Sequence, residues 1–298
     1  MAAPLLIADV PWLLYRSYFA LPKSIADADG APVNALLGTV NALLSCEELL
    51  APEGGVRAIV ACMGAEEAAY RVALYPPYHA HRDPMPPELR GQWERVPELM
   101  QSLGFIWADT DDLEADDLLY SYALAEVARG GEALMLTADR DLFGAVTDGA
   151  QVLELLRGGG IGRVGPAEVR ERYGVEPRQV PDFIALRGDP SDGIPGAPGI
   201  GAKTAAELLR AHDTLEQLLQ DARSPGGAGA DLRPRTRGAL LDNEAQLLAF
   251  KEIATLQKVK VKRPPDTPTN HARGAEAAEA LGMRRLAERL RKLADEAT

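Results

Sequence analysis

The chain has 298 residues, of which 46% are hydrophobic and 26% charged, a balance typical of a soluble globular protein. Its formal net charge of −12 disfavours nucleic acid as a partner, unless the acids gather in one site and the bases in another. Cys46 and Cys62 fit neither a zinc site nor a disulfide framework, so a cytoplasmic location is expected. No segment approaches the roughly 20 apolar residues of a membrane span, and the N-terminus lacks the features of a signal peptide.

Short apolar strands alternate with helices through the first half of the chain. Strands are expected at 4–9, 57–63, 105–108, 133–139 and 151–156, with helices at 31–50, up to 103 and from the acidic run at 111–117 to Gly130. This alternation predicts an α/β fold with a mostly parallel central sheet. Because strands disappear after about residue 165, we expect an α/β domain at 1–165 and a helical subdomain at 166–298.

Carboxylates recur at the ends of the predicted elements. Strands 4–9 and 133–139 both end in an acid, and ligands of open α/β sheets bind at that edge. The helix that follows DDLEADD opens with further acids, at the positive end of its dipole. The acids at element ends are Asp9, Glu114, Asp116, Asp117, Asp139, Asp141, Asp189 and Asp192. For any one of them a helix cap or a surface position is an equally good interpretation, whereas for the set it is not.

Oxygen ligands without His or Cys suit Mg²⁺ or Mn²⁺. Two such ions are the usual device for hydrolysing phosphodiesters, because they supply the attacking water and stabilise the developing charge. The set of carboxylates therefore predicts a two-metal hydrolytic site. Asp111 and Asp112 are expected to be an N-cap and a solvated acid outside it.

Two segments have features of nucleic-acid binding. GIPGAPGIGAKTAAELL, at 193–209, is a tight turn followed by a helix start, where backbone N–H groups could hold a phosphate; a plain helix–helix turn is the alternative. The Pro-rich segment at 75–93 interleaves aromatic and basic residues, which suits unpaired nucleotides, although an ordinary surface loop is also possible. Bases at 233–237 and 258–263 make the C-terminal part locally basic.

Several motifs together resemble the bacterial 5′→3′ exonuclease/flap endonuclease family, which also occurs at the N-terminus of DNA polymerase I. They are LLIAD, YRVALYPPYHAHR, LEADDLL, LTADRDL, YGVEPRQVPDFIALRGDPSDGIPG and GIGAKTAAELL, in this order. The resemblance implies a stand-alone, monomeric and cytoplasmic enzyme of DNA replication or repair. It would cut DNA at a 5′ flap, overhang or branched end, and would carry an arch region and a helix–three-turn–helix motif.

The resemblance also implies roles for single residues. Asp9, Glu114 and Asp116 match ligands of a first metal, Asp117 matches a further site acid, and the second metal would be held by Asp139, Asp141, Asp189 and Asp192. The residues that match DNA contacts are Arg71, Tyr78, His79 and Arg82 in the arch, and Gly199, Gly201, Lys203 and Thr204 in the hairpin. The hairpin of this family often holds K⁺ through backbone carbonyls.

The chain departs from the family pattern at two positions that matter most. Gly64 stands where the family has a carboxylate of the first metal site, and His79 stands where it has a lysine. Glu66 and Glu67 are the candidates to replace the missing acid through a water molecule. We therefore expect weakened metal binding that Gly64→Asp would restore. A catalytically weak paralogue that binds branched DNA is the alternative function, followed by an RNA-cleaving, toxin-like domain.

Overall fold

The structure, a computed structural model, describes residues 3–224, 226, 229 and 231–296. One six-stranded sheet lies at its centre, with the strand order β3-β2-β1-β4-β5-β6. The strands are β1 (Leu5–Asp9), β2 (Ala58–Cys62), β3 (Ile106–Ala108), β4 (Ala133–Leu136), β5 (Ala150–Leu155) and β6 (Ile161–Val164). All neighbours are parallel except β5 and β6, which are antiparallel.

The predicted parallel sheet is confirmed, with one strand missed. The glycine-rich sequence at 158–162 is typical of a turn, but only its first part is a turn, and β6 begins at Ile161. Gly158, Gly159 and Gly160 all have positive φ, a conformation that lets the chain reverse within three residues. The pattern did not reveal β6 because its residues, IGRV, contain a glycine and an exposed arginine.

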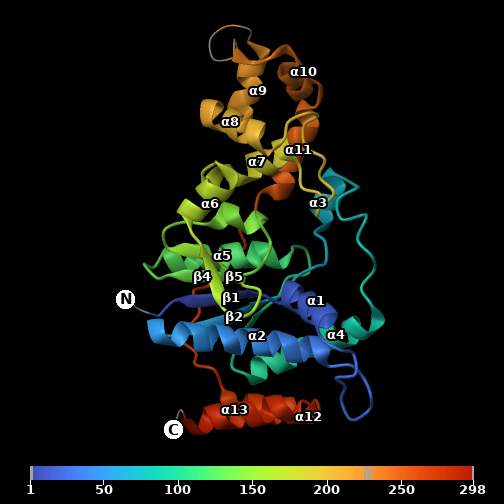
Figure 1. The fold of residues 1–298 in the computed structure, drawn as a ribbon, viewed down its shortest axis with the longest axis vertical. Coiled ribbons are helices and arrows are strands. Elements are labelled where there is room, and N and C mark those ends of the chain that lie inside the picture. The colour runs from blue at the N-terminus through green and yellow to red at the C-terminus, as the bar shows by residue number, and fades with distance from the viewer. Residues whose placement is uncertain (1–2, 225, 227–228, 230, 297–298) are drawn as a thin grey trace.

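Alternation along β1 separates two cores. Leu5 and Ile7 pack on one face of the sheet, whereas Leu6 and Ala8 pack on the other, and all four are fully buried. The first face carries α5 (Ala115–Val127). The second face carries α1 (Val10–Ala20), α2 (Asn34–Leu50) and α4 (Pro87–Ser102), which lie on one side of the sheet in Figure 1.

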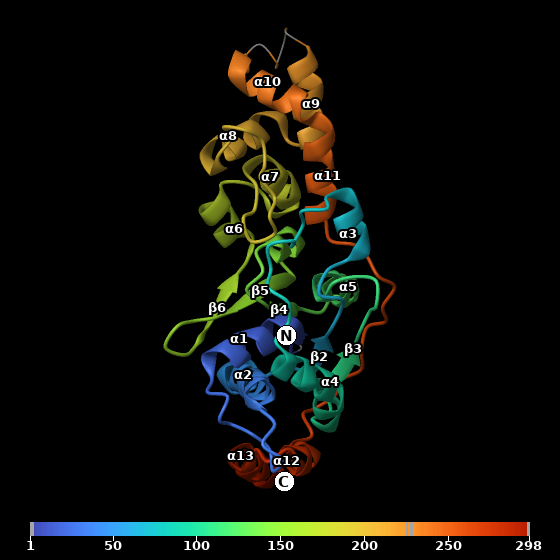
Figure 2. The same cartoon turned by 90° about the vertical axis from the view of Figure 1, so that its right-hand side faces the viewer.

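Helices dominate the second half of the chain and extend away from the sheet (Figures 1 and 2). They are α6 (Pro166–Tyr173), α7 (Val180–Arg187), α8 (Ala202–His212), α9 (Leu215–Arg223), α10 (Pro234–Asp242) and α11 (Glu244–Ala254). Between β2 and α4 lies the short α3 (Ala69–Leu74), and the 3₁₀ turns are η1 (Ala51–Glu53), η2 (Asp141–Ala145) and η3 (Pro177–Gln179).

The last two helices follow residue 166 in the chain but pack against the α/β part. An extended segment, 255–270, leads back along the α/β part to α12 (His271–Ala280) and α13 (Arg284–Glu296). Their apolar residues join the core of α2 and α4, at the opposite end of the molecule from α8–α10 (Figure 1). Within the predicted subdomain 166–298, the residues of α12 and α13 thus pack with the α/β layer, and the boundary at residue 166 stays a prediction.

Candidate active site

Parallel strands bring the first acids to one edge of the sheet. Asp9 is the last residue of β1 and caps α1, accepting a hydrogen bond from the Trp12 N–H at 3.0 Å. Asp139 follows the neighbouring strand β4, and Glu114 is the N-cap residue of α5. The Thr137 hydroxyl donates to Asp9 at 2.7 Å and accepts from the Asp139 N–H at 3.0 Å. Thr137 thus connects two of the acids, although no sequence motif singled it out.

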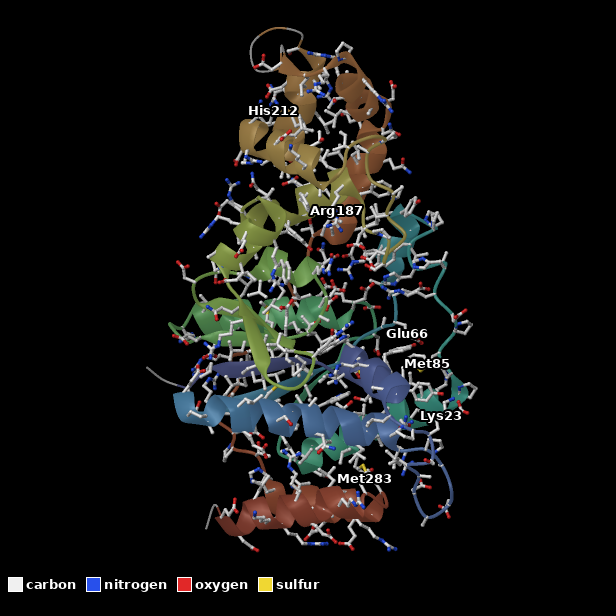
Figure 3. All side chains as sticks on the ribbon, viewed as in Figure 1. Lys23, Glu66, Met85, Arg187, His212 and Met283 are labelled. Atoms are coloured by element: carbon white, nitrogen blue, oxygen red, sulfur yellow. The ribbon has the colours of Figure 1, made fainter. Side chains whose placement is uncertain are left out.

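A cavity of about 1270 Å³ opens at this edge. It is lined by every predicted site acid except Asp117, namely Asp9, Glu114, Asp116, Asp139, Asp141, Asp189 and Asp192. Figure 3 shows Arg187 above the sheet and Glu66 and Met85 beside α1, and these three residues also line the cavity. The first and the last of these acids, Asp9 and Asp192, bound a span of 184 residues, and only the fold brings the acids together.

Crowded carboxylates destabilise each other's charged form. Burial, with Glu114 nearby, raises the pKa of Asp9 to about 6. Burial and the charge of Asp192 raise the pKa of Asp139 to about 7. The pKa values of Asp116 and Asp141 are also raised, first by burial and then by Asp139. Such a cluster is stable as carboxylates only when cations neutralise it.

The chemistry of these groups fits hard divalent cations, since all of the ligand atoms are oxygens. Among the described residues, however, no three acids already form a complete set of metal ligands. Glu114 is one reason, because protein groups occupy its oxygens. They accept from the Ala68 N–H at 2.8 Å and the Tyr78 hydroxyl at 3.2 Å, and Arg71 pairs with them at 2.7 Å.

Arg71 lines the cavity, but its side chain is buried and paired with acids. Its guanidinium pairs with Glu114 at 2.7 Å and Asp117 at 3.1 Å, and it donates to the Ile253 carbonyl at 3.1 Å. Asp117 is fully buried, does not line the cavity and accepts a second bond, from the Gln257 N–H at 2.6 Å. Both residues thus connect α5 to the end of α11 and the residues that follow it, and the phosphate contact of Arg71 stays a prediction.

Tyr78 and His79 also point inward. They stack on each other with ring centroids 3.8 Å apart, and both are buried. His79 Nε2 lies 3.1 Å from Asp192, and its φ of 55° is unusual for a residue other than glycine. Both side chains nevertheless line the cavity. The base stacking of Tyr78 and the DNA contact of His79, which the family resemblance implies, stay predictions. Arg82, which pairs with Asp192 at 3.1 Å, keeps a half-exposed side chain.

Gly64 has no room for the missing acid. A Cβ atom at this position would lie 2.7 Å from both the Ala115 nitrogen and the Leu113 carbonyl oxygen. The family carboxylate is therefore replaced by a close approach of two backbone segments, which only glycine permits. Glu66 and Glu67 do line the cavity, but Glu66 accepts from Tyr15 at 3.1 Å.

The hairpin before α8 lies apart from the acids, toward the upper end of the molecule in Figure 1. Gly199 has a φ of 76°, and Gly201 is the N-cap residue of α8, with no side chain closing the helix start. Lys203 is exposed and Thr204 is partly exposed. Free N–H groups beside an exposed lysine are typical of a phosphate-binding helix start.

Fold and site together define a class of protein. It is a phosphodiester hydrolase that has a parallel α/β sheet and an acidic, cation-dependent centre at the carboxyl edge of that sheet. Family models place the chain within that class. Residues 4–174 match the 5′-3′ exonuclease N-terminal resolvase-like domain, and 175–273 match the 5′-3′ exonuclease C-terminal SAM fold. The chain therefore belongs to the 5′-3′ exonuclease family.

Relatives of full length support this assignment. A 5′-3′ exonuclease of Mycobacterium tuberculosis is 33% identical, with 99% of each chain covered, and one of Streptomyces coelicolor is 34% identical, with 94% of this chain covered. DNA polymerase I of M. tuberculosis is 34% identical, but only 28% of its length is matched. The resemblance to stand-alone exonucleases is thus confirmed.

Solved structures confirm the fold. The T5 D15 protein co-crystallised with metal ions has a TM-score of 0.65 at 17% identity, with 97% of each chain covered. The catalytic core of Rad2 in complex with DNA substrate has a TM-score of 0.61 at 14% identity, covering 97% of this chain and 91% of that one. No helix among the described residues is long and apolar enough to cross a membrane.

Proposed function

We propose that the protein is a divalent-metal-dependent 5′ nuclease that hydrolyses DNA near a 5′ end or flap. The observation that carries this proposal is one cavity lined by seven acids, in which burial and then mutual repulsion raise the pKa values of several of them. Named 5′-3′ exonucleases among the relatives favour it over a catalytically silent DNA-binding module. Mg²⁺ or Mn²⁺, two ions in all, would be held by Asp9, Asp116, Asp139, Asp141, Asp189 and Asp192.

The bound ions would polarise a water molecule and the scissile phosphate. The protein's own residues do the positioning. Thr137 orients Asp9, and the Arg71 ion pairs hold Glu114 and the start of α5 in place. Glu114 would complete the first site if Arg71 released it. Direct attack by water, without a covalent intermediate on the protein, is expected for this kind of hydrolysis.

DNA would contact two further places. Arg82 reaches the mouth of the cavity with an exposed side chain, and the helix start at Gly201, Lys203 and Thr204 suits a phosphate of the duplex. Carbonyl groups of the hairpin around Gly199 would be the ligands of a K⁺ ion. These contacts follow the backbone and would not depend on base sequence.

The test is cleavage of an end-labelled 5′-flap DNA in Mg²⁺ and in Mn²⁺. Product lengths distinguish release of mononucleotides from cutting at the flap junction. The Asp116→Ala variant is the control for contaminating nucleases, and its binding to the same DNA is measured without metal. Retained binding by the wild type without any product in either metal would contradict the proposal.

A further inference from the structure

The cavity has a second wall that the acids do not explain. Trp12, Tyr15 and Phe19 follow each other at helical spacing on α1, and Trp93 joins them from α4; all four line the cavity. Figure 1 shows α1 and α4 side by side below the helical part. We name these four residues the aromatic platform. The sequence pointed to the aromatic residues of the segment 75–93, which include Trp93, but not to those of α1.

The rings of the aromatic platform are ordered against one another. Tyr15 stacks on Phe19 with centroids 6.4 Å apart and an interplanar angle of 25°, and Trp93 meets Tyr15 edge-on at 6.3 Å. The Tyr15 hydroxyl donates to Glu66 at 3.1 Å, which fixes that ring. Phe19 nevertheless remains 72% exposed. Leaving most of a large apolar ring in water has a free-energy cost, which a stacked base would reduce.

Two exposed arginines near the aromatic platform could pair with the phosphates of a nucleic-acid strand. Arg82 and Arg90 line the same cavity, and their side chains are 47% and 58% exposed. Each has one acidic partner, Asp192 at 3.1 Å for Arg82 and Glu66 at 3.7 Å for Arg90. Exposed arginines beside stacked aromatic rings are how proteins hold unpaired nucleotides, with rings against bases and guanidinium groups against the backbone.

We propose that the aromatic platform binds unpaired bases of the 5′ single strand, with the exposed face of Phe19 as the main stacking surface. The inference rests on the proposed function, because the platform is continuous with the acidic wall of the same cavity. A nucleotide stacked there would keep the strand from sliding while the adjoining phosphodiester lies among the acids. Since every base has a π face, this holding would be independent of sequence.

Binding without metal tests the platform separately from cleavage. A 5′-flap DNA carries the fluorescent base 2-aminopurine in its single strand, and quenching and affinity are measured in EDTA. Phe19→Ala should reduce the quenching and weaken binding about tenfold, as expected for the loss of one stacked base. Phe19→Tyr should behave like the wild type, and Phe19→Leu like Phe19→Ala, because leucine keeps apolar surface without a ring. Leu49→Ala, another exposed hydrophobic residue outside the cavity, should have no effect.

A second DNA, whose flap nucleotides lack bases, completes the design. The wild type should bind it about tenfold more weakly, and Phe19→Ala should cause no further loss. Equal binding of both DNAs by the wild type, or wild-type affinity of Phe19→Leu, would overturn the inference and assign Phe19 to another contact. Absence of cleavage by the wild type in metal would contradict the nuclease function alone, since the platform is measured in EDTA.

Discussion

Asp116 shows how a single side chain can serve activity at the expense of stability. Its pKa is raised by burial and by Asp139, Asp9 and Glu114, so its charged form is unfavourable in the folded protein without cations. Asp117, the next residue, is instead neutralised by Arg71 and capped by the Gln257 N–H. Neighbours in the sequence therefore have opposite roles, since one faces the cavity and the other the core.

The Asp116→Asn variant should lose cleavage by about 10²-fold or more, because a charged group that holds the ions is gone. Without metal it should be more stable than the wild type, since one repelling charge is removed. The matched Asp117→Asn variant should be less stable, because Arg71 loses a partner. Thermal unfolding in EDTA, together with cleavage rates, measures both effects. Lower stability of Asp116→Asn would show that the acids do not repel each other.

Gly64→Asp is expected to harm the protein rather than restore a metal ligand. The new Cβ would overlap the backbone of residues 113–115, which carries Glu114. Overpacking of this kind costs about 1–3 kcal/mol, measured as a loss of unfolding free energy in urea. The metal concentration for half-maximal cleavage should rise or stay the same. A marked fall in that concentration would support the earlier expectation from the sequence.

Among the elements, the extended segment 255–270 is held by an ion-pair cluster on α5. Glu126, almost fully buried, pairs with Arg57 and with Arg263 at 2.9 Å, and Arg57 also donates to the Pro264 carbonyl at 2.9 Å. The Ser121 hydroxyl accepts from the Val259 N–H at 2.8 Å, one turn closer to the acids. The same helix thus carries the site at its start and anchors the returning chain along its length.

Glu126→Ala should destabilise the protein by about 3–5 kcal/mol, because Arg57 loses its buried carboxylate and keeps only the exposed Asp266 as an ion-pair partner. Urea unfolding measures the loss. Compared with the wild type, the variant should show a larger increase of the hydrogen-exchange rate in 257–264 than in β1. The control is Glu48→Ala, which removes an exposed partner of Arg289 and should cost less than about 1 kcal/mol. Equal effects of the two variants would mean that the buried cluster does not hold this segment.

For the whole molecule, the acidic cavity makes stability depend on pH. Asp9 and Asp139 have folded-state pKa values of about 6 and about 7, above the roughly 3.9 of an unfolded aspartate. Between pH 4 and 7 the folded state therefore binds more protons than the unfolded state. Unfolding free energy in EDTA should fall as the pH rises through this range.

We expect the metal-free protein to be more stable at pH 5 than at pH 7.5, by a difference on the order of 2 kcal/mol. Mg²⁺ should add stability mainly at the higher pH, where the carboxylates are ionised and can bind it. Thermal unfolding at both pH values, with EDTA or with Mg²⁺, gives the four measurements needed. A metal-free protein that becomes less stable on going from pH 7.5 to pH 5 would contradict this prediction.

Residue patterns by themselves determined the parallel strands and the set of acids, because period and local composition specify these features. The strand expected at 133–139 nevertheless ends at Leu136, so Asp139 lies beyond it. Gly64 was recognised as a departure, but not as a position without space, since the obstruction comes from residues 113–115. Likewise, the inward orientation of Tyr78 and His79 depends on Glu114 and Asp192, far along the chain. Family motifs specify which residues are present, not which way a side chain points.

Only the tertiary structure decided which aromatic residues border the cavity. Spacing on α1 places Trp12, Tyr15 and Phe19 on one face, but nothing local shows whether that face is buried. Packing of α1 against α4 leaves Phe19 in solvent beside the acids, whereas Tyr75 packs on Phe250. Sequence thus determined the chemistry at the sheet edge, because strand ends are local. The aromatic wall depends on contacts between distant helices, which only the folded chain contains.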